Sequence, residues 1–291
     1  MNVIWSKFVQ GANTLYYSRR LRFSDCFAPQ YTDFFSLDKG KKLKILEIGC
    51  GPGALSGALK RWYPEAEVVG VDRDTEFIRF AGEHESGVRF VEGDATALPF
   101  ADASFDVTIS NTVSEHVDPI KFYGEQHRVL KPGGICLVLS SCRSINQTPS
   151  CLKTKPLEND FWEKVNQYDN SLERFSVCQY PMTEAELPAA MEAHGFSSVA
   201  TGYATVDLTP DCPKYSCQMA IDMINANRYS TLDAIATAAA TAPEHFTQDE
   251  LQEVMRLANE RFDTRLRDYE KGIKHWDTNV LTILMVRGIK R

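Results

Sequence analysis

A glycine-dense turn, Gly49-Cys50-Gly51-Pro52-Gly53, is the part of this sequence whose residue types and spacing could do chemistry. Glycines at alternate positions permit positive φ angles and remove the Cβ atoms that would keep a ligand away from the backbone. The apolar run Leu43-Lys44-Ile45-Leu46 precedes the turn and residues 54–59 follow it, which is typical of a strand, a tight turn and a helix. The first N–H groups of such a helix are unpaired, so we expect a polar ligand at the turn.

An acidic residue supports a nucleotide as this ligand. Asp72 ends a second apolar run, Val68-Val69-Gly70-Val71, and it lies about twenty residues after the first glycine, where nucleotide-binding βαβ units carry a ribose-binding carboxylate. A glycine turn alone is also compatible with a plain strand-to-helix connection. The acid at this spacing favours nucleotide binding.

Composition and charge restrict the function classes. The 291 residues suffice for one large α/β domain with insertions or for two domains, and the net charge of -7 argues against nucleic acid or an anionic membrane as a partner. Of the eight cysteines, Cys50 and Cys136 fall in elements that we expect to be buried, and no C-x-x-C pair occurs. The histidines are scattered. We therefore expect reduced thiols, no metal site and a cytoplasmic protein, with no secretory leader and no membrane span.

Short apolar runs alternate with helical stretches along the rest of the chain. We expect strands at residues 43–48, 68–71, 88–91, 105–110, 134–140, 196–206 and 280–286, and a helix over residues 119–130. This pattern predicts an α/β fold, namely a doubly wound, mostly parallel, seven-stranded Rossmann-like sheet with helical insertions. Ligands of such sheets bind outside the carboxyl ends of the strands.

The segments outside this pattern are expected to cover the site. Residues 1–36 form a predicted N-terminal helical lid with one or two short helices, and residues 37–291 form the main domain with insertions at about 141–180 and 210–276. The aromatic residues of the N-terminal segment either pack on the main domain or, as a lid, bring Tyr17 or Arg20 to a carboxylate of the ligand. The second insertion contains a helix opened by the capping box Thr247-Gln248-Asp249-Glu250, with an apolar stripe that runs to Ile273.

The glycine turn and Asp72 resemble the corresponding motifs of class I S-adenosylmethionine-dependent methyltransferases, especially the branch of ubiquinone and menaquinone biosynthesis enzymes. Gly93-Asp94-Ala95 with Leu98-Pro99-Phe100 is similar to the loop that holds the adenine in that family. Arg128-Val129-Leu130-Lys131-Pro132-Gly133-Gly134 resembles the helix end before its fifth strand. The resemblance covers about residues 41–141 and leaves the acceptor side uncovered.

The resemblance implies S-adenosylmethionine as cofactor and a set of residues that hold it. These are Glu47, Gly49, Cys50, Gly51, Gly53, Asp72, Arg73, Asp94, Ala95 and Asn111. Tyr17 and Arg20 are added as cofactor-binding candidates from the predicted lid, which the resemblance does not cover. His116 follows the fourth strand and is the candidate catalytic base, unless it only packs at the start of the next helix. The segment from Ser110 to Val117 lacks an Asn-Pro-Pro-Tyr type motif, which favours a small-molecule acceptor over adenine N6 or glutamine.

We therefore expect a methyltransferase that moves a methyl group to a small-molecule acceptor by in-line displacement. Two alternatives stay open. Gly49-x-Gly51-x-x-Ala54 with Asp72 also satisfies the fingerprint of an NAD-dependent oxidoreductase, and the chain could be a noncatalytic module that binds S-adenosylmethionine. The expected partner is the small-molecule acceptor, without nucleic acid, and a homodimer is a possible assembly.

Overall fold

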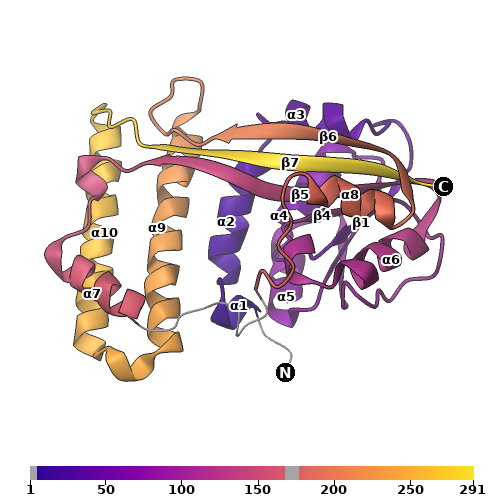
Figure 1. The fold of residues 1–291 in the computed structure, drawn as a ribbon. Helices are drawn as coiled ribbons and strands as arrows, with labels where there is room; N and C mark the ends of the chain where they lie inside the picture. The colour runs from indigo at the N-terminus through magenta and orange to yellow at the C-terminus, as the bar shows by residue number, and fades with distance from the viewer. Residues whose placement is uncertain (1–4, 168–176) are drawn as a thin grey trace. The chain divides into compact units, whose positions relative to one another are not determined.

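A seven-stranded sheet organises the computed structural model, which describes residues 5–167 and 177–291 (Figure 1). The strand order is β3-β2-β1-β4-β5-β7-β6. The strands are β1 (Lys44–Ile48), β2 (Glu67–Asp72), β3 (Val88–Glu92), β4 (Phe105–Asn111), β5 (Leu130–Gln147), β6 (Phe196–Asp207) and β7 (Thr278–Lys290). This is the doubly wound α/β sheet that the sequence predicts.

The chain divides into two compact units. One, the helical unit, comprises Met1–Leu21, Ser144–Phe175 and Asp207–Val280, and the other, the sheet unit, comprises Arg22–Arg143, Ser176–Val206 and Leu281–Arg291. The chain therefore passes from one unit to the other within the long strands β5 and β7. The predicted lid is divided as well, because residues 22–36 belong to the sheet unit.

The first five strands of the sheet are parallel and their apolar residues are buried. β1 pairs with β2 and β4, β2 with β3, and β4 with β5, all in parallel. Ile45, Leu46 and Ile48 of β1 have no exposed surface, as expected of a parallel strand covered on both faces. β7 runs antiparallel to β6, since Ser197 Oγ donates to Ile289 O at 3.2 Å and Leu208 N donates to Asn279 O at 2.9 Å.

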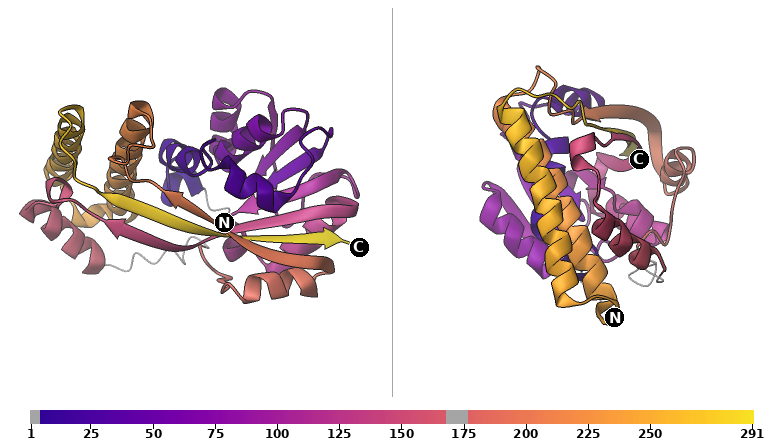
Figure 2. Two further views of the ribbon diagram at one scale, coloured as in Figure 1. Left: turned by 90° about the horizontal axis from the view of Figure 1, so that it is seen from above. Right: turned by 90° about the vertical axis from the view of Figure 1, so that its left-hand side faces the viewer.

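Helices cover both faces of the sheet unit. They are α3 (Ala28–Phe35), α4 (Ala54–Trp62), α5 (Thr75–His84), α6 (Pro119–Val129) and α8 (Glu186–Ala193), and Figure 2 shows α8 on the opposite face from α3 and α4. Asp74 caps α5 by accepting from Glu76 N at 3.1 Å, and Asp118 caps α6 by accepting from Ile120 N at 2.9 Å. A capping box precedes α8, because Thr183 and Glu186 exchange side-chain to backbone hydrogen bonds.

The helices of the helical unit are α1 (Trp5–Phe8), α2 (Ala12–Arg22), α7 (Pro156–Gln167), α9 (Cys217–Thr241) and α10 (Gln248–Glu270). The last residue of α2, Arg22, already belongs to the sheet unit. Short 3-10 turns lie at Ser150–Leu152 and Pro243–His245. Figure 2 shows α9 and α10 side by side. Phe161 of α7, Ile235 of α9 and Val254 of α10 meet in one core cluster in which none of the three side chains is exposed. The insertions at 141–180 and 210–276 supply most of this unit, and residues 168–176 of the first lie outside the described residues.

Two expectations for the helices were wrong. Residues 5–36 contain three helices instead of one or two. Tyr31 and Phe35 of α3 are fully buried, in accord with the alternative that aromatic residues of this segment pack on the main domain. The apolar stripe of α10 ends before Ile273, which lies beyond the helix and is 49% exposed. The buried face of α10 instead includes two charged residues, Arg261 and Arg265, because acidic partners from distant segments accept their hydrogen bonds. None of the described helices is long and apolar enough to cross a membrane.

Candidate functional site

The strand register brings four predicted segments to one edge of the sheet. Ile48 pairs with Val71 on one side and with Ser110 on the other, and Asp72 pairs with Glu92. The residues that follow these positions, among them Gly49, Gly93 and Asn111, therefore lie at the carboxyl ends of four adjacent strands. The chain order reverses between β1 and β4, which is where ligands bind to doubly wound sheets.

The glycine turn has the conformation that its composition predicts. Gly49, Gly51 and Gly53 have φ angles of 66°, 52° and 91°, which L-residues with a side chain rarely adopt. A Cβ atom on Gly49 would lie 2.4 Å from Cγ2 of Val113, so the loop after β4 approaches the turn closely. The N–H groups of Gly49 and Cys50 both donate to Val71 O, at 2.8 and 3.0 Å, which ties the turn to β2.

The Asp72 carboxylate lies across this turn. Its Oδ2 accepts a hydrogen bond from Gly51 N at 2.8 Å and its Oδ1 accepts one from Asp74 N at 2.9 Å. Desolvation raises the pKa of Asp72, and the two backbone donors and the neighbouring Arg73 partly offset this increase. Each carboxylate oxygen can accept a second hydrogen bond, so the group can still bind two hydroxyls of a diol.

Glu47 lies beneath the turn and is only 2% exposed. Burial raises its pKa to about 8, although a hydrogen bond donated by Ser56 Oγ, at the start of α4, lowers it in part. The thiol of Cys50 is buried as well, and desolvation together with Asp72 and Glu47 raises its pKa well above the ordinary value. The desolvated environment beneath the turn thus favours the protonated, neutral forms of Glu47 and Cys50.

The loop after β3 carries Asp94 and Ala95. Gly93 N donates to Asp72 O at 2.9 Å, and a Cβ atom on Gly93 would lie 2.8 Å from both Pro99 Cδ and Val71 Cγ2, so only glycine fits here. Asp94 is exposed, and its Oδ1 accepts from Thr96 N at 2.7 Å and from Thr96 Oγ1 at 2.8 Å. The second carboxylate oxygen of Asp94 can therefore accept a hydrogen bond from a ligand.

Two residues that the sequence did not single out as functional hold this loop. Arg128 Nη1 donates to Phe100 O at 2.7 Å and Arg128 Nη2 donates to Leu98 O at 3.0 Å. Glu125 accepts from Leu98 N at 2.6 Å and also binds Arg128. Because both side chains come from α6, the helix end that resembled a family motif fixes the loop after β3. In the sequence, only the position of Arg128 within that motif indicated that this residue could have a role at the site.

The end of β4 places Asn111 and His116 next to the turn in the fold. Asn111 is half-buried and donates weakly to Thr112 Oγ1 at 3.4 Å. His116 ends a 3-10 turn (Ser114–His116), and its Nδ1 accepts from Cys178 N at 2.9 Å. Burial and the charge of Arg73 lower the pKa of His116 to about 4. The imidazole is therefore neutral at pH 7 with its basic nitrogen engaged, and its role as a base stays a prediction.

Three further predicted site residues lie on the surface or in the helical unit. Arg73 is exposed and directly follows Asp72. Tyr17 and Arg20 lie on α2, in the helical unit, where the Tyr17 ring packs against Tyr229 with 5.7 Å between ring centroids. The structure thus brings together the ten candidates from Glu47 to Asn111 in the sheet unit, and the roles of Tyr17 and Arg20 stay predictions.

The seven cysteine side chains that the structure describes are free thiols. Among the described residues, Cys151, Asp268 and His275 bring potential metal-ligating atoms within 4.8 Å of one another. The sequence does not indicate this group, because Cys151 is far from Asp268 and His275 along the chain. His275 Nε2 and Asp268 Oδ2 are 2.8 Å apart, so a hydrogen bond accounts for their proximity.

Comparison with known proteins identifies the segment that forms the turn and its surroundings. Residues 46–138 match the methyltransferase domain family. Demethylmenaquinone methyltransferase of Thermus thermophilus is 42% identical over 109 residues, which are 36% of this chain and 49% of that protein. Fatty-acid O-methyltransferase of Mycolicibacterium smegmatis is 39% identical over 98 residues, which are 32% of this chain and 35% of that protein. The matches thus span about half of these relatives or less.

Solved structures share the fold over nearly the whole chain. Phosphoethanolamine N-methyltransferase 2 of Haemonchus contortus, solved with S-adenosyl-L-methionine, superposes with a TM-score of 0.53 and 15% identity, covering 100% of this chain and 60% of that chain. The YcgJ protein of Bacillus subtilis gives a TM-score of 0.50 with 20% identity, covering 91% of this chain and 98% of that chain. Residues 46–138 therefore form a class I methyltransferase domain, the kind of domain that uses S-adenosylmethionine as its methyl donor.

Proposed function

We propose that this protein is an S-adenosylmethionine-dependent methyltransferase that acts on a small molecule. The observation that carries the proposal is the position of Asp72, whose carboxylate bridges Gly51 N and Asp74 N at the carboxyl edge of the sheet. A carboxylate held in this way accepts the two hydroxyls of a ribose, and the glycine turn leaves room for the methionine end of the cofactor.

The residues around the turn fit this cofactor better than a dinucleotide. The Asp72 carboxylate lies across the glycine turn, where a dinucleotide would place its negatively charged pyrophosphate. The ammonium and sulfonium groups of S-adenosylmethionine are cationic and would be attracted there. In this proposal Asp94 accepts from the adenine amino group, the Ala95 N–H donates to a ring nitrogen, and Arg128 and Glu125 keep their loop in place.

The cofactor supplies a methyl group on a sulfonium, and the protein mainly has to align the acceptor with it and exclude water. His116 is a weak base because burial and the charge of Arg73 lower its pKa to about 4, so an acceptor that is already a good nucleophile suits this site best. The relatives described above are a demethylmenaquinone methyltransferase and a fatty-acid O-methyltransferase, which supports a small-molecule acceptor here.

Calorimetry with the full chain tests the proposal. We expect S-adenosylmethionine and its demethylated product to bind in the micromolar range, and NAD not to bind. Tight binding of NAD without binding of the methyl donor would support the oxidoreductase alternative instead. Incubation of the protein with cell extract and isotopically labelled cofactor then separates an enzyme, which transfers label to a small molecule, from a noncatalytic binding module, which does not.

We also propose a cytoplasmic location, without nucleic acid as a partner. The free thiols among the described cysteines and the net charge of -7 support these two points. Fractionation of cells that express the protein, and light scattering of the purified chain, test the location and the possible homodimer.

A further inference from the structure

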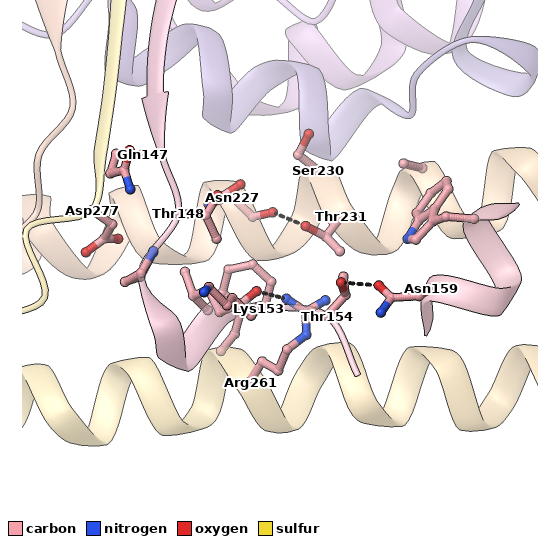
Figure 3. A pocket seen from close by; sticks show the side chains of 15 residues that line it. Gln147, Thr148, Lys153, Thr154, Asn159, Asn227, Ser230, Thr231, Arg261 and Asp277 are labelled. Carbon is pink, nitrogen blue, oxygen red and sulfur yellow. Dashed lines mark hydrogen bonds between the residues drawn. The ribbon is translucent and has the colours of Figure 1, made fainter. Parts of the chain in front are cut away.

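The helical unit contains a pocket of about 720 Å³ that the proposed function does not use. It lies among α7, α9, α10 and the segment after β5, and all of its lining residues belong to the helical unit (Figure 3). Pockets of about 300 to 1,000 Å³ commonly hold small molecules. The pocket is therefore large enough for a ligand of the size of a sugar.

The wall that α9 contributes is polar but uncharged. Asn227, Thr231 and Ala234 line the pocket, and their spacing of four and then three residues places them on one face of the helix. Figure 3 shows Asn227 and Thr231 on the side of α9 that faces Arg261. Among residues 5–167 and 177–291, the Asn227 side-chain amide has no hydrogen-bond partner, so it can bind hydroxyl groups.

Two of the charged residues in the pocket are already neutralised. Arg261 Nε donates to both oxygens of the fully buried Glu158, at 3.1 and 3.2 Å, and Arg261 Nη1 donates to Leu152 O at 2.7 Å. On the other side, Asp277 Oδ1 accepts from Arg265 Nε at 2.9 Å and from Arg265 Nη2 at 2.7 Å. Neither residue therefore offers a net charge to a ligand.

Lys153 differs from these two residues. It lines the pocket and is exposed, and its ammonium has no ion-pair partner within the part of the chain that the structure describes. Leu152, Trp162 and Phe262 add apolar surface to the same pocket. The lining thus combines one available cation with uncharged hydrogen-bonding groups and an apolar patch.

We propose that this pocket binds a small, hydroxyl-rich molecule that carries one anionic group, such as a sugar acid or a sugar phosphate. Lys153 binds the anion. Asn227 and the ion-paired residues Arg261 and Asp277 form hydrogen bonds with the hydroxyls. The carbon side of the ligand packs on Trp162 and its apolar neighbours. This binding does not depend on methyl transfer, so it can be measured without the methyl donor.

Four probes of similar length test the two parts of the proposal. D-gluconate and D-glucose 6-phosphate carry hydroxyls and an anion, sorbitol carries only the hydroxyls, and hexanoate carries only the anion. We expect saturation-transfer NMR and calorimetry with the full chain to detect gluconate or glucose 6-phosphate at millimolar concentration, and at least about tenfold weaker binding of the other two. Binding of neither anionic probe, or equal binding of sorbitol or hexanoate, overturns the proposal.

Variants connect the binding to this pocket. Lys153→Met should weaken the binding of the anionic probe by about tenfold or more, because it removes a charge-assisted contact. Lys271→Met is the matched control, since Lys271 is also exposed in the helical unit and has no ion-pair partner among the described residues. Ala234→Phe places a large side chain in the pocket and should weaken binding by obstructing it, with the thermal midpoint as the check on folding. If Lys153→Met binds the probe as the wild type does, the site is not here.

Discussion

The carboxylate of Asp72 and the backbone N–H of Gly51 form a hydrogen bond of 2.8 Å between Oδ2 and N. The residue that would bind the ribose therefore also holds the glycine turn in its conformation. Because one side chain does both, loss of the carboxylate should affect ligand binding and turn geometry together, and tests of the site need variants that separate the two effects.

Gly49→Ala tests the close packing at the turn. Gly49 has a φ angle of 66°, and a Cβ atom would lie 2.4 Å from Val113 Cγ2. Gly133→Ala is the matched control, because Gly133 has a φ angle of 76° but nothing within 4 Å of a built Cβ atom. The left-handed backbone should destabilise both variants by about 1 to 2 kcal/mol. The overlap of the new Cβ atom with Val113 should destabilise only Gly49→Ala, by about 1 to 3 kcal/mol more. Urea unfolding measures the difference, and equal losses would contradict it.

The sequence predicted the elements whose signals are local. The glycine turn, Asp72 and the strands that carry them lie where the spacing placed them, because glycine conformation and strand burial are local properties. The contacts that hold the adenine-loop candidate were missed, since Arg128 reaches carbonyl oxygens 28 and 30 residues away.

The buried charged residues of α10 are a second case in which contacts between distant residues could not be predicted from the sequence. Nothing in the sequence around Arg261 and Arg265 singles them out as buried residues. In the structure Arg261 binds Glu158, which is 103 residues away, and the pair is buried. Helical periodicity cannot reveal such a partner, because the pairing depends on how distant segments pack.

Glu47 should make the stability of the fold depend on pH. Its pKa is about 8 in the folded protein and 4.5 as the ordinary value, so the folded state retains a proton that the unfolded state releases. The stabilisation is complete below pH 4.5 and is lost as the pH rises to about 8, at up to about 1.4 kcal/mol per pH unit. As the pH rises, the free energy of unfolding of the wild type should therefore fall relative to that of Glu47→Gln, whose side chain cannot ionise.

Urea unfolding of both proteins between about pH 5.5 and pH 7.5 measures this difference, which should grow by about 2 kcal/mol across that range. The difference between the two proteins removes the contribution of His116, whose lowered pKa acts in the opposite direction. A constant difference would mean that Glu47 is ionised in the folded protein.

Glu158→Gln should destabilise the helical unit. The substitution leaves the Arg261 guanidinium, only 7% exposed, without its counter-charge, which costs about 3 to 5 kcal/mol in buried pairs. The double variant Glu158→Leu/Arg261→Met should recover most of that loss, because it removes both charges together. Arg256→Met, at an exposed ion pair on the same helix, should leave the thermal midpoint nearly unchanged. If the double variant is less stable than Glu158→Gln, the pair contributes net stability and this expectation is wrong.

Arg128→Leu should weaken the binding of S-adenosylmethionine without removing any group that touches it. The variant loses the two hydrogen bonds to the carbonyl oxygens of Leu98 and Phe100, so the loop with Asp94 becomes less ordered before binding. We expect about a three- to tenfold higher dissociation constant by calorimetry. Arg79→Leu, which breaks ion pairs with Glu76 and Glu83 on the surface of α5, is the control and should bind as the wild type does.

Asp72→Ala should have the largest effect on the cofactor. It removes two charge-assisted hydrogen bonds to the ribose, each worth roughly 1.5 to 3 kcal/mol, of which water replaces a part. A net loss of about 2 to 4 kcal/mol corresponds to roughly 30- to 1000-fold weaker binding. The variant also loses the bonds to Gly51 N and Asp74 N, so a lower thermal midpoint is expected as well.

Two further variants separate binding from stability in this experiment. Thr247→Ala removes the N-cap of α10 in the helical unit, so it should lower the midpoint and leave the cofactor dissociation constant unchanged. Asp72→Asn keeps one acceptor oxygen and should bind more tightly than Asp72→Ala but more weakly than the wild type. The cofactor dissociation constants of the three variants, measured by calorimetry, are compared with their thermal midpoints without ligand. This comparison shows whether a loss of binding is separate from a loss of stability. If Asp72→Ala stays folded and binds within threefold of the wild type, the carboxylate does not hold the ribose, and the proposed site at the glycine turn is wrong.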